Sequence, residues 1–248
     1  MFHCFIKRLN LGWREYIENM HRLIKMAEIK LHGSWYSPFT LRVVWTLNLK
    51  GIPYDSIEED HFNRTPQLLQ YNPIHKKTPV LVHDGKPICE SMIIVEYIDE
   101  IWPQNSLLPA DPYARAQARF WVKYIDDMFS AIRAFHRSII KGEEREKSRE
   151  NLSERLKVVE DQCLDDHNKF YGGETINIVD IALGSFVKFI EVQEDMFEVK
   201  ILKSERFPRL HLWFNNFKDV PIIKENTPEQ EKFVAYVRPL IEKIMASS

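Results

Sequence analysis

The chain has 248 residues, 44% of them hydrophobic, and a formal net charge of −2. This length suits one large domain or two smaller ones, and the charge lacks the basic excess expected of a nucleic-acid binder. Without a run of 18 apolar residues, we expect no membrane span. The cysteines Cys4, Cys89 and Cys163 form no C-x-x-C pair and no zinc-type spacing. We therefore expect no metal site and no structural disulfide, as in a soluble protein of a reducing compartment.

The first 26 residues mix apolar and basic side chains at loosely helical spacing. They include Glu15 and Glu18 but no serine, whereas a transit peptide is rich in serine and poor in acids. They also lack the unbroken apolar core of a signal peptide. We expect residues 1–26 to be a poorly ordered extension outside the folded unit.

Residues 27–105 alternate between strand and helix patterns. Short apolar runs predict strands, Asp84-Gly85 predicts a hairpin turn, and Pro38 and Ser91 stand at helix starts. The predicted order is β-α-β-α-β-β-α, with elements at 28–32, 38–50, 53–58, 66–70, 80–82, 87–89 and 92–102. This order predicts a small mixed sheet of four strands with helices on its faces.

No strand pattern follows the proline-rich linker at 106–112. Long helical patterns predict an all-α unit over 113–248, with helices at 113–140, 143–170, from 177, 208–217 and 227–244. Asn177-x-x-Asp180 is typical of a helix-capping element. The charged stretch 143–150 is typical of a solvated helical face.

Three polar positions precede helices or strands in the first half. Ser37 and Ser91 have the pattern of helix N-caps, each worth about 1 kcal/mol. The bond between Thr78 and Pro79 is expected to be trans from sequence alone, because cis bonds are uncommon even before proline. On these residues alone, a purely structural role is sufficient.

Several longer segments carry a resemblance to a known family. They are SPF with Arg42 and Val43, KGIPY (50–54), EED (58–60), YNPIHKKTPVLVHDGKPICES (71–91), YIDEIW (97–102) and LLPADPYARAQARFW (107–121). Together they resemble the soluble glutathione transferases, most closely the plant tau class, over nearly everything from Ala27 onward. The resemblance implies a thioredoxin-like α/β domain followed by an all-α domain.

The resemblance implies a glutathione site on the first domain. Glutathione has two carboxylates, an ammonium and a thiol, and a helix N-terminus with free N–H groups is a ready anion site. The implied binding residues are Ser37, Arg64, Lys77, Thr78, Pro79, Glu90 and Ser91. Glu90 takes the ammonium, Ser91 the γ-glutamyl carboxylate, and a cis Thr78-Pro79 bond offers backbone to the cysteinyl part. The family usually has Asn-Lys-Ser where this chain reads Asn63-Arg64-Thr65, so we expect Arg64 to keep the charge with altered affinity.

Ser37 matches the family's catalytic serine. A free thiol has a pKa of roughly 8.5, and its thiolate is the nucleophile. A hydroxyl donor worth roughly 1.5–3 kcal/mol and a helix N-terminus worth about 0.3–2 kcal/mol would lower that pKa by about one to three units. Tyr36 is a minor alternative donor. A serine rather than a cysteine argues against disulfide reduction, and Cys89 is expected to be a buried strand residue.

The second substrate of such a protein is an electrophile held between the two domains. The resemblance implies a site lined by Tyr36, Phe39, Trp121, Ser130, Ala134 and Arg137, although core packing of Phe39 is an equal alternative. It also implies a homodimer in the cytosol, with glutathione as cosubstrate, no tightly bound cofactor, and hydroperoxide reduction as a second activity. The rival interpretation is a non-catalytic carrier of hydrophobic molecules or glutathione conjugates.

Overall fold

The computed structural model describes residues 28–141 and 145–246, and the predicted N-terminal extension falls outside them. Four strands form one sheet in the order β2-β1-β3-β4. They are β1 Ile29–Gly33, β2 Asp55–Glu58, β3 Val80–His83 and β4 Lys86–Cys89. β1 runs parallel to β2, while the other two pairings are antiparallel, which confirms the predicted mixed sheet.

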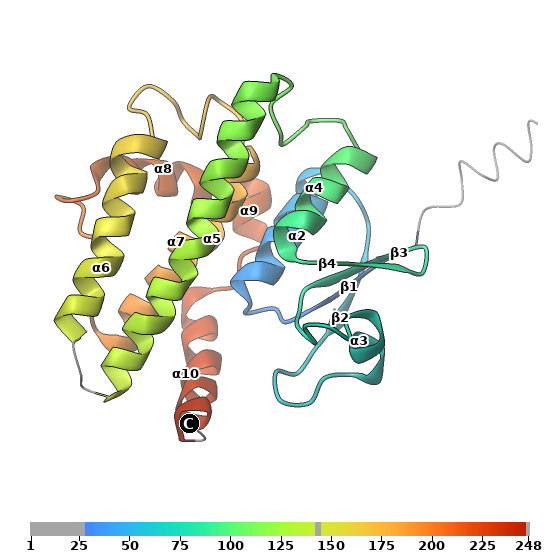
Figure 1. The fold of residues 1–248 in the computed structure, drawn as a ribbon, viewed down its shortest axis with the longest axis horizontal. Coiled ribbons are helices and arrows are strands. Elements are labelled where there is room, and N and C mark those ends of the chain that lie inside the picture. Colours follow the sequence, from blue (N-terminus) through green and yellow to red (C-terminus); the bar gives the residue numbers. More distant parts are fainter. Residues whose placement is uncertain (1–27, 142–144, 247–248) are drawn as a thin grey trace, which may run out of the picture.

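Three helices cover the two faces of this sheet (Figure 1). They are α2 Pro38–Leu49, α3 Pro66–Tyr71 and α4 Ser91–Ile101. Because successive side chains of a strand point to opposite faces, Leu81 packs with α2 and α4, whereas Val80 and Val82 pack against Leu68 of α3. The α2 and α4 face is also the one turned toward the rest of the molecule.

Only helices follow the sheet in the described part of the chain (Figure 1). They are α5 Pro112–Lys141, α6 Arg145–Val158, the π-helical turn η1 Val159–Cys163, α7 Ile178–Phe197, α8 Pro208–Lys218, α9 Pro221–Glu225 and α10 Gln230–Ala246. The buried helix α7 lies at the centre, in contact with α5, α2 and α10. The predicted α/β unit followed by an all-helical unit is therefore confirmed. Among the described residues, no helix has both the length and the apolar character needed to span a bilayer.

One predicted helix is shorter than expected, and one short helix was not predicted. The helix expected over 143–170 ends at Cys163, because Leu164 turns extended and the chain continues through turns at Gly172 and Gly173, both at positive φ. The short helix α9 was not predicted, since five residues are too few to show a helical apolar period.

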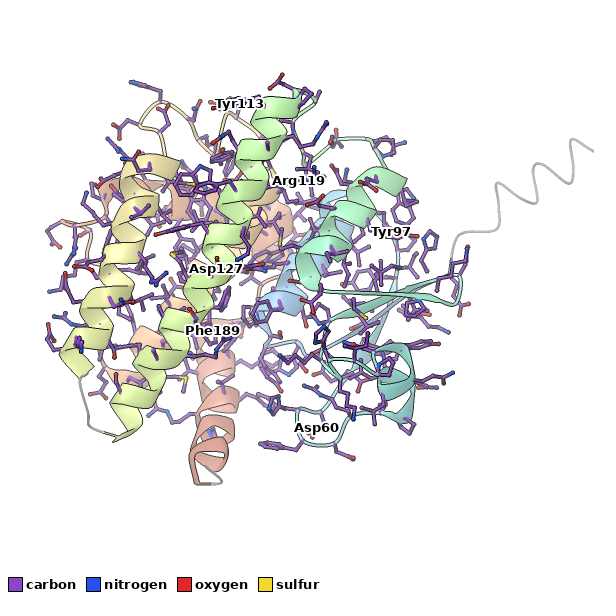
Figure 2. All side chains as sticks on the ribbon, in the orientation of Figure 1. Asp60, Tyr97, Tyr113, Arg119, Asp127 and Phe189 are labelled. Carbon is purple, nitrogen blue, oxygen red and sulfur yellow. The ribbon has the colours of Figure 1, made fainter. Side chains whose placement is uncertain are left out.

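A buried lysine ties the sheet unit to the connection that leads into α5. The Lys50 ammonium bonds to Asp99 Oδ1 at 2.5 Å and to the carbonyl oxygens of Trp102, Gln104 and Asn105 at 2.8–3.1 Å. Farther along the same boundary, Arg119 of α5 pairs with Glu96 of α4 at 2.6 Å (Figure 2). These contacts fix how the helical unit sits on the sheet unit.

Candidate functional site

The strand register gathers four loop segments at one edge of the sheet. Gly33 at the end of β1 is level with Glu58 at the end of β2, and His32 is level with Val80 at the start of β3. Val80 is in turn level with Cys89 at the end of β4. The segments that begin α2, leave β2, enter β3 and begin α4 therefore share this edge. They contain all the predicted glutathione-binding residues.

Ser37 lies at the N-terminus of α2, between the sheet and the helical unit. Its extended backbone makes it the N-cap, and its Oγ accepts a hydrogen bond from Thr40 N at 3.4 Å. The cap uses an oxygen lone pair and leaves the hydroxyl proton available, and no described residue accepts that proton. The predicted cap is confirmed, and the proton is free to meet an anion at the positive end of the helix dipole.

Ser91 does not cap α4, contrary to the prediction. The helix begins at Ser91 itself, and the N-cap position belongs to Glu90, whose side chain makes no cap hydrogen bond. Glu90 has φ 71°, an uncommon conformation for a residue with a side chain, which concentrates at functional sites. Its carboxylate is exposed, 3.9 Å from His75 Nε2, whereas Ser91 is buried and its Oγ accepts from Arg42 Nη1 at 3.2 Å.

Arg42 was not among the predicted site residues, yet it connects the site to the helical unit. Its fully buried guanidinium donates to Ser91 Oγ, to Ser185 Oγ of α7 at 2.8 Å, and pairs with Asp126 of α5 at 2.7 Å. Burial lowers the pKa of Arg42, and Asp126 opposes that shift. Because Arg42 donates to Ser91 Oγ, the Ser91 proton is left to point elsewhere. A charged residue within an apolar helix was the sequence signal for this cluster.

The Thr78-Pro79 bond is cis, as the resemblance implied and the sequence alone did not. Pro79 is buried, directly before β3. The adjacent Lys77 is exposed, and its carbonyl accepts from Asn72 Nδ2 at 3.0 Å. This leaves the Lys77 side chain at the surface beside the sheet edge.

Arg64 is held by groups of its own loop. Its Nη1 donates to the Glu59 carbonyl at 3.4 Å, and its Nη2 lies 3.3 Å from His61 Nδ1. Burial, followed by the charge of Arg64, lowers the pKa of His61, so the neutral imidazole can accept this hydrogen bond. Arg64 is therefore oriented before any anion arrives.

The predicted electrophile residues are dispersed. Trp121 is buried in the main core, and Phe39 packs against Phe129 with ring centroids 4.6 Å apart. On α5, Ser130 and Ala134 are exposed, and Ser130 Oγ donates to the carbonyl of Asp127 at 2.6 Å. The side chain of Arg137 lies outside the described ones.

The last helix contributes aromatic side chains that the sequence reasoning missed. Tyr236 of α10 lies with its ring centroid 5.0 Å from those of both Trp35 and Tyr36, and Phe233 is 5.9 Å from Trp35. The Lys232 ammonium lies 5.6 Å from the Trp35 ring. Burial is the main reason that the pKa of Tyr36 is raised, so its phenol is a weaker acid than usual. The residues just before Ser37 are thus covered by α10.

The described cysteines lack the features of a catalytic thiol. Cys89 is half-buried and its Sγ lies 3.8 Å from the carbonyl of Tyr71, while Cys163 is buried in the core. Burial raises the pKa of both thiols, which disfavours the reactive thiolate. Within residues 28–141 and 145–246, no group of three or more His, Cys, Asp or Glu side chains is placed to hold a metal ion.

Comparison with known proteins follows the same division of the chain. The family profile described as "Glutathione S-transferase, N-terminal domain" matches residues 27–100, and "Glutathione S-transferase, C-terminal domain" matches residues 142–216. A probable glutathione S-transferase of Nicotiana tabacum is 45% identical over 223 residues, covering 90% of this chain and 98% of the relative. Glutathione S-transferase U3 of Arabidopsis thaliana is 40% identical, covering 90% of this chain and 98% of the relative.

Solved structures agree with these sequence matches. A tau class glutathione S-transferase from mango, Mangifera indica, superposes with a TM-score of 0.79 at 40% identity, covering 86% of this chain and 98% of the mango chain. Rice GST1 in complex with glutathione superposes with a TM-score of 0.78 at 31% identity, covering 88% of this chain and 98% of the rice chain.

Proposed function

This chain belongs to the tau class of the glutathione S-transferase family, and we propose that it conjugates glutathione to hydrophobic electrophiles through a thiolate stabilised by Ser37. The observation that carries this proposal is the position of Ser37 Oγ at the N-terminus of α2, where it accepts from Thr40 N and keeps its own proton available to donate. It lies on the sheet edge that also holds Thr78-Pro79 and Glu90-Ser91.

Each binding residue is assigned to the group of glutathione whose charge or hydrogen-bonding capacity it complements. The Glu90 carboxylate takes the ammonium, and the Ser91 proton, directed away from Arg42, takes the γ-glutamyl carboxylate. The backbone at Thr78-Pro79 takes the cysteinyl part, while Arg64 and Lys77 take the glycyl carboxylate, for which an arginine fork is well suited. The complex of rice GST1 with glutathione supports this choice of ligand.

The proposed chemistry is a nucleophilic attack by sulfur. Ser37 Oγ–H donates to the thiolate, and the helix N-terminus behind it stabilises the same charge. The sulfur bonds to the electrophilic carbon as a leaving group departs or a double bond accepts the electron pair. Holding the two reactants together supplies much of the rate. Tyr36, Phe39 and the rings of α10 supply the apolar side of this site.

The same thiolate supports a second activity on organic hydroperoxides. It attacks the terminal peroxide oxygen, releasing an alcohol and leaving a sulfenic acid on glutathione. A second glutathione then gives the disulfide and water. The family also supports a homodimer in the cytosol, with glutathione as a cosubstrate and no tightly bound cofactor.

The deciding experiment compares Ser37→Ala with Ser37→Thr. We expect Ser37→Ala to lose about 10²-fold or more in conjugation rate, the cost of removing one preorganised donor to an anion. It should also raise the pKa of bound glutathione, followed by thiolate absorbance against pH. Ser37→Thr keeps both hydroxyl and cap, so it should retain most activity. Full activity and an unchanged thiol pKa in Ser37→Ala would remove Ser37 from this role. Binding of hydrophobic compounds without turnover in the unmodified protein would instead identify a carrier.

A further inference from the structure

Glu59, directly after β2, is a fully buried carboxylate beside the proposed glutathione site. Its Oε2 accepts from Thr65 N at 2.9 Å, and its Oε1 accepts from Thr65 Oγ1 at 2.6 Å. His32 Nδ1 of β1 lies 2.8 Å from the same Oε1. The Glu59 side chain therefore joins the sheet to Thr65, the N-cap of α3, across a loop that contains Asp60 (Figure 2).

The backbone of Glu59 makes a second set of bonds. Its N–H donates to the Gly33 carbonyl at 2.9 Å, and its carbonyl accepts from Ser34 Oγ at 2.6 Å. The same carbonyl accepts from Arg64 Nη1 at 3.4 Å. One residue is thus bonded both to the turn that precedes Ser37 and to the loop that carries Arg64.

A buried carboxylate is costly unless its oxygens are satisfied, and these are. Burial alone would raise the pKa of Glu59, but the hydrogen bonds from Thr65 and His32 outweigh it and lower the pKa below its ordinary value. The side chain is therefore an anion at neutral pH. The carboxylate links His32 of β1 to Thr65, while the backbone of the same residue holds the Gly33-Ser34 turn and Arg64.

We propose that Glu59 is a positioning residue for glutathione: by fixing Thr65 and the Gly33-Ser34 turn together, it sets Arg64 at the correct distance from Ser37 to receive the glycyl carboxylate. This inference rests on the proposed function, because it needs Arg64 to bind that carboxylate. Glu59 itself touches no substrate. Its effect is transmitted through Thr65 to the residue immediately before it.

The test compares glutathione with its glycyl ethyl ester, which keeps the thiol and the γ-glutamyl group but lacks the glycyl charge. In Glu59→Gln we expect KM for glutathione to rise about tenfold, the size of one lost well-aligned hydrogen bond. KM for the ester, KM for the electrophile and kcat should change less than about twofold. The preference for glutathione over its ester should therefore fall about tenfold.

A matched control separates positioning from stability. Glu160 is equally buried and caps α8 by accepting from Arg209 N and Leu210 N at 2.8–2.9 Å, far along the chain in the helical unit. Glu160→Gln should lower the thermal midpoint without altering the preference for glutathione over the ester. If Glu59→Gln behaves in the same way, Glu59 serves the fold alone and the proposal is overturned.

Arg64→Met separates the binding role of Arg64 from the positioning role of Glu59. It should lower the preference for glutathione over the ester at least as far as Glu59→Gln does, leaving the part that Lys77 supplies, and adding Glu59→Gln to it should then change the preference no further. If Arg64→Met leaves the preference intact, the assignment of Arg64 fails and this proposal with it. If Arg64→Met lowers the preference and Glu59→Gln does not, only the role of Glu59 is wrong. Should Glu59→Gln fail to fold, Thr65→Val removes one of the same bonds and must shift the preference in the same direction.

Discussion

Replacing Lys50 by methionine tests the contact that anchors the connection between the two units. The Lys50 side chain is 1% exposed, and its ammonium meets Asp99 and three backbone carbonyl groups. Methionine keeps the apolar stem but removes the charge. Asp99, also buried, then loses its cation while keeping hydrogen bonds from Leu107 N, Leu108 N and Ser106 Oγ.

The structure sets the size of the expected loss. Removing one partner of a buried ion pair costs about 3–5 kcal/mol when the other charge is left uncompensated. The three remaining donors to Asp99 reduce this cost, so we expect Lys50→Met to lower the free energy of unfolding by about 2–4 kcal/mol. For a chain of this size, that corresponds to a fall of roughly 5–15 °C in the thermal midpoint.

The assay is urea unfolding at neutral and acid pH, with Lys86→Met, at an exposed lysine of β4, as the matched control. Burial raises the pKa of Asp99, but the bonds from Lys50 and the linker outweigh it and lower the pKa below its ordinary value. Stability from this carboxylate is therefore present above about pH 4 and lost as the pH falls through the lowered value. The difference between Lys50→Met and the unmodified protein should narrow over the same range. A loss no larger than that of Lys86→Met at pH 7 would refute the reasoning.

Three further predictions concern buried groups. Arg42→Met should raise KM for glutathione about tenfold, because Ser91 loses the donor that orients its hydroxyl, while KM for the electrophile stays unchanged; equal changes in both would contradict this. Burial raises the pKa of Asp180 to about 7, so the free energy of unfolding should fall as the pH rises from about 4 to 7. In urea titrations, Asp180→Asn should remove roughly 2–4 kcal/mol of that fall, and parallel pH profiles of the two proteins would refute this prediction. Burial raises the pKa of Cys163, so peptide mapping after alkylation at pH 8 should find this thiol unmodified in the native protein and modified in urea.

Much of the sheet unit was predictable because its signals are local. The alternation of apolar residues, the Asp84-Gly85 turn and the prolines at helix starts each act within a few residues, and the predicted order of elements along the chain is the one observed. The residues predicted to bind glutathione stand at the junctions between these elements. Their meeting at one edge also needs the antiparallel pairing of β3 with β1, which the order of elements along the chain left open, whereas the β3-β4 hairpin was predicted from Asp84-Gly85.

The proposed electrophile site was less predictable, because its lining depends on contacts between residues that are far apart in the sequence. The α10 rings reach Trp35 and Tyr36 across some two hundred residues of chain, and no local pattern in either segment indicates the other. Trp121 was correctly predicted to lie on the long helix α5, but it was expected in the electrophile site. It is instead buried in the main core by residues of other helices. An aromatic residue on an amphipathic helix does not reveal whether it faces a core or a ligand.

Arg42 is a case in which the sequence indicates that a side chain needs buried partners but does not identify them. Within α2, it stands between the buried residues Leu41 and Val43, and a charge in that position requires partners because an unpaired buried ion is prohibitively costly. The twelve residues of α2 are enough to show that the Arg42 charge requires partners. The partners themselves lie on α4, α5 and α7, and Ser185 of α7 is 143 residues away. Since Ser91 is one of those partners, the docking of the helical unit and the orientation of the proposed γ-glutamyl subsite depend on the same guanidinium. A change at Ser185 or Asp126 is therefore coupled to the proposed glutathione site through the Arg42 side chain, and the sheet unit alone does not show this coupling.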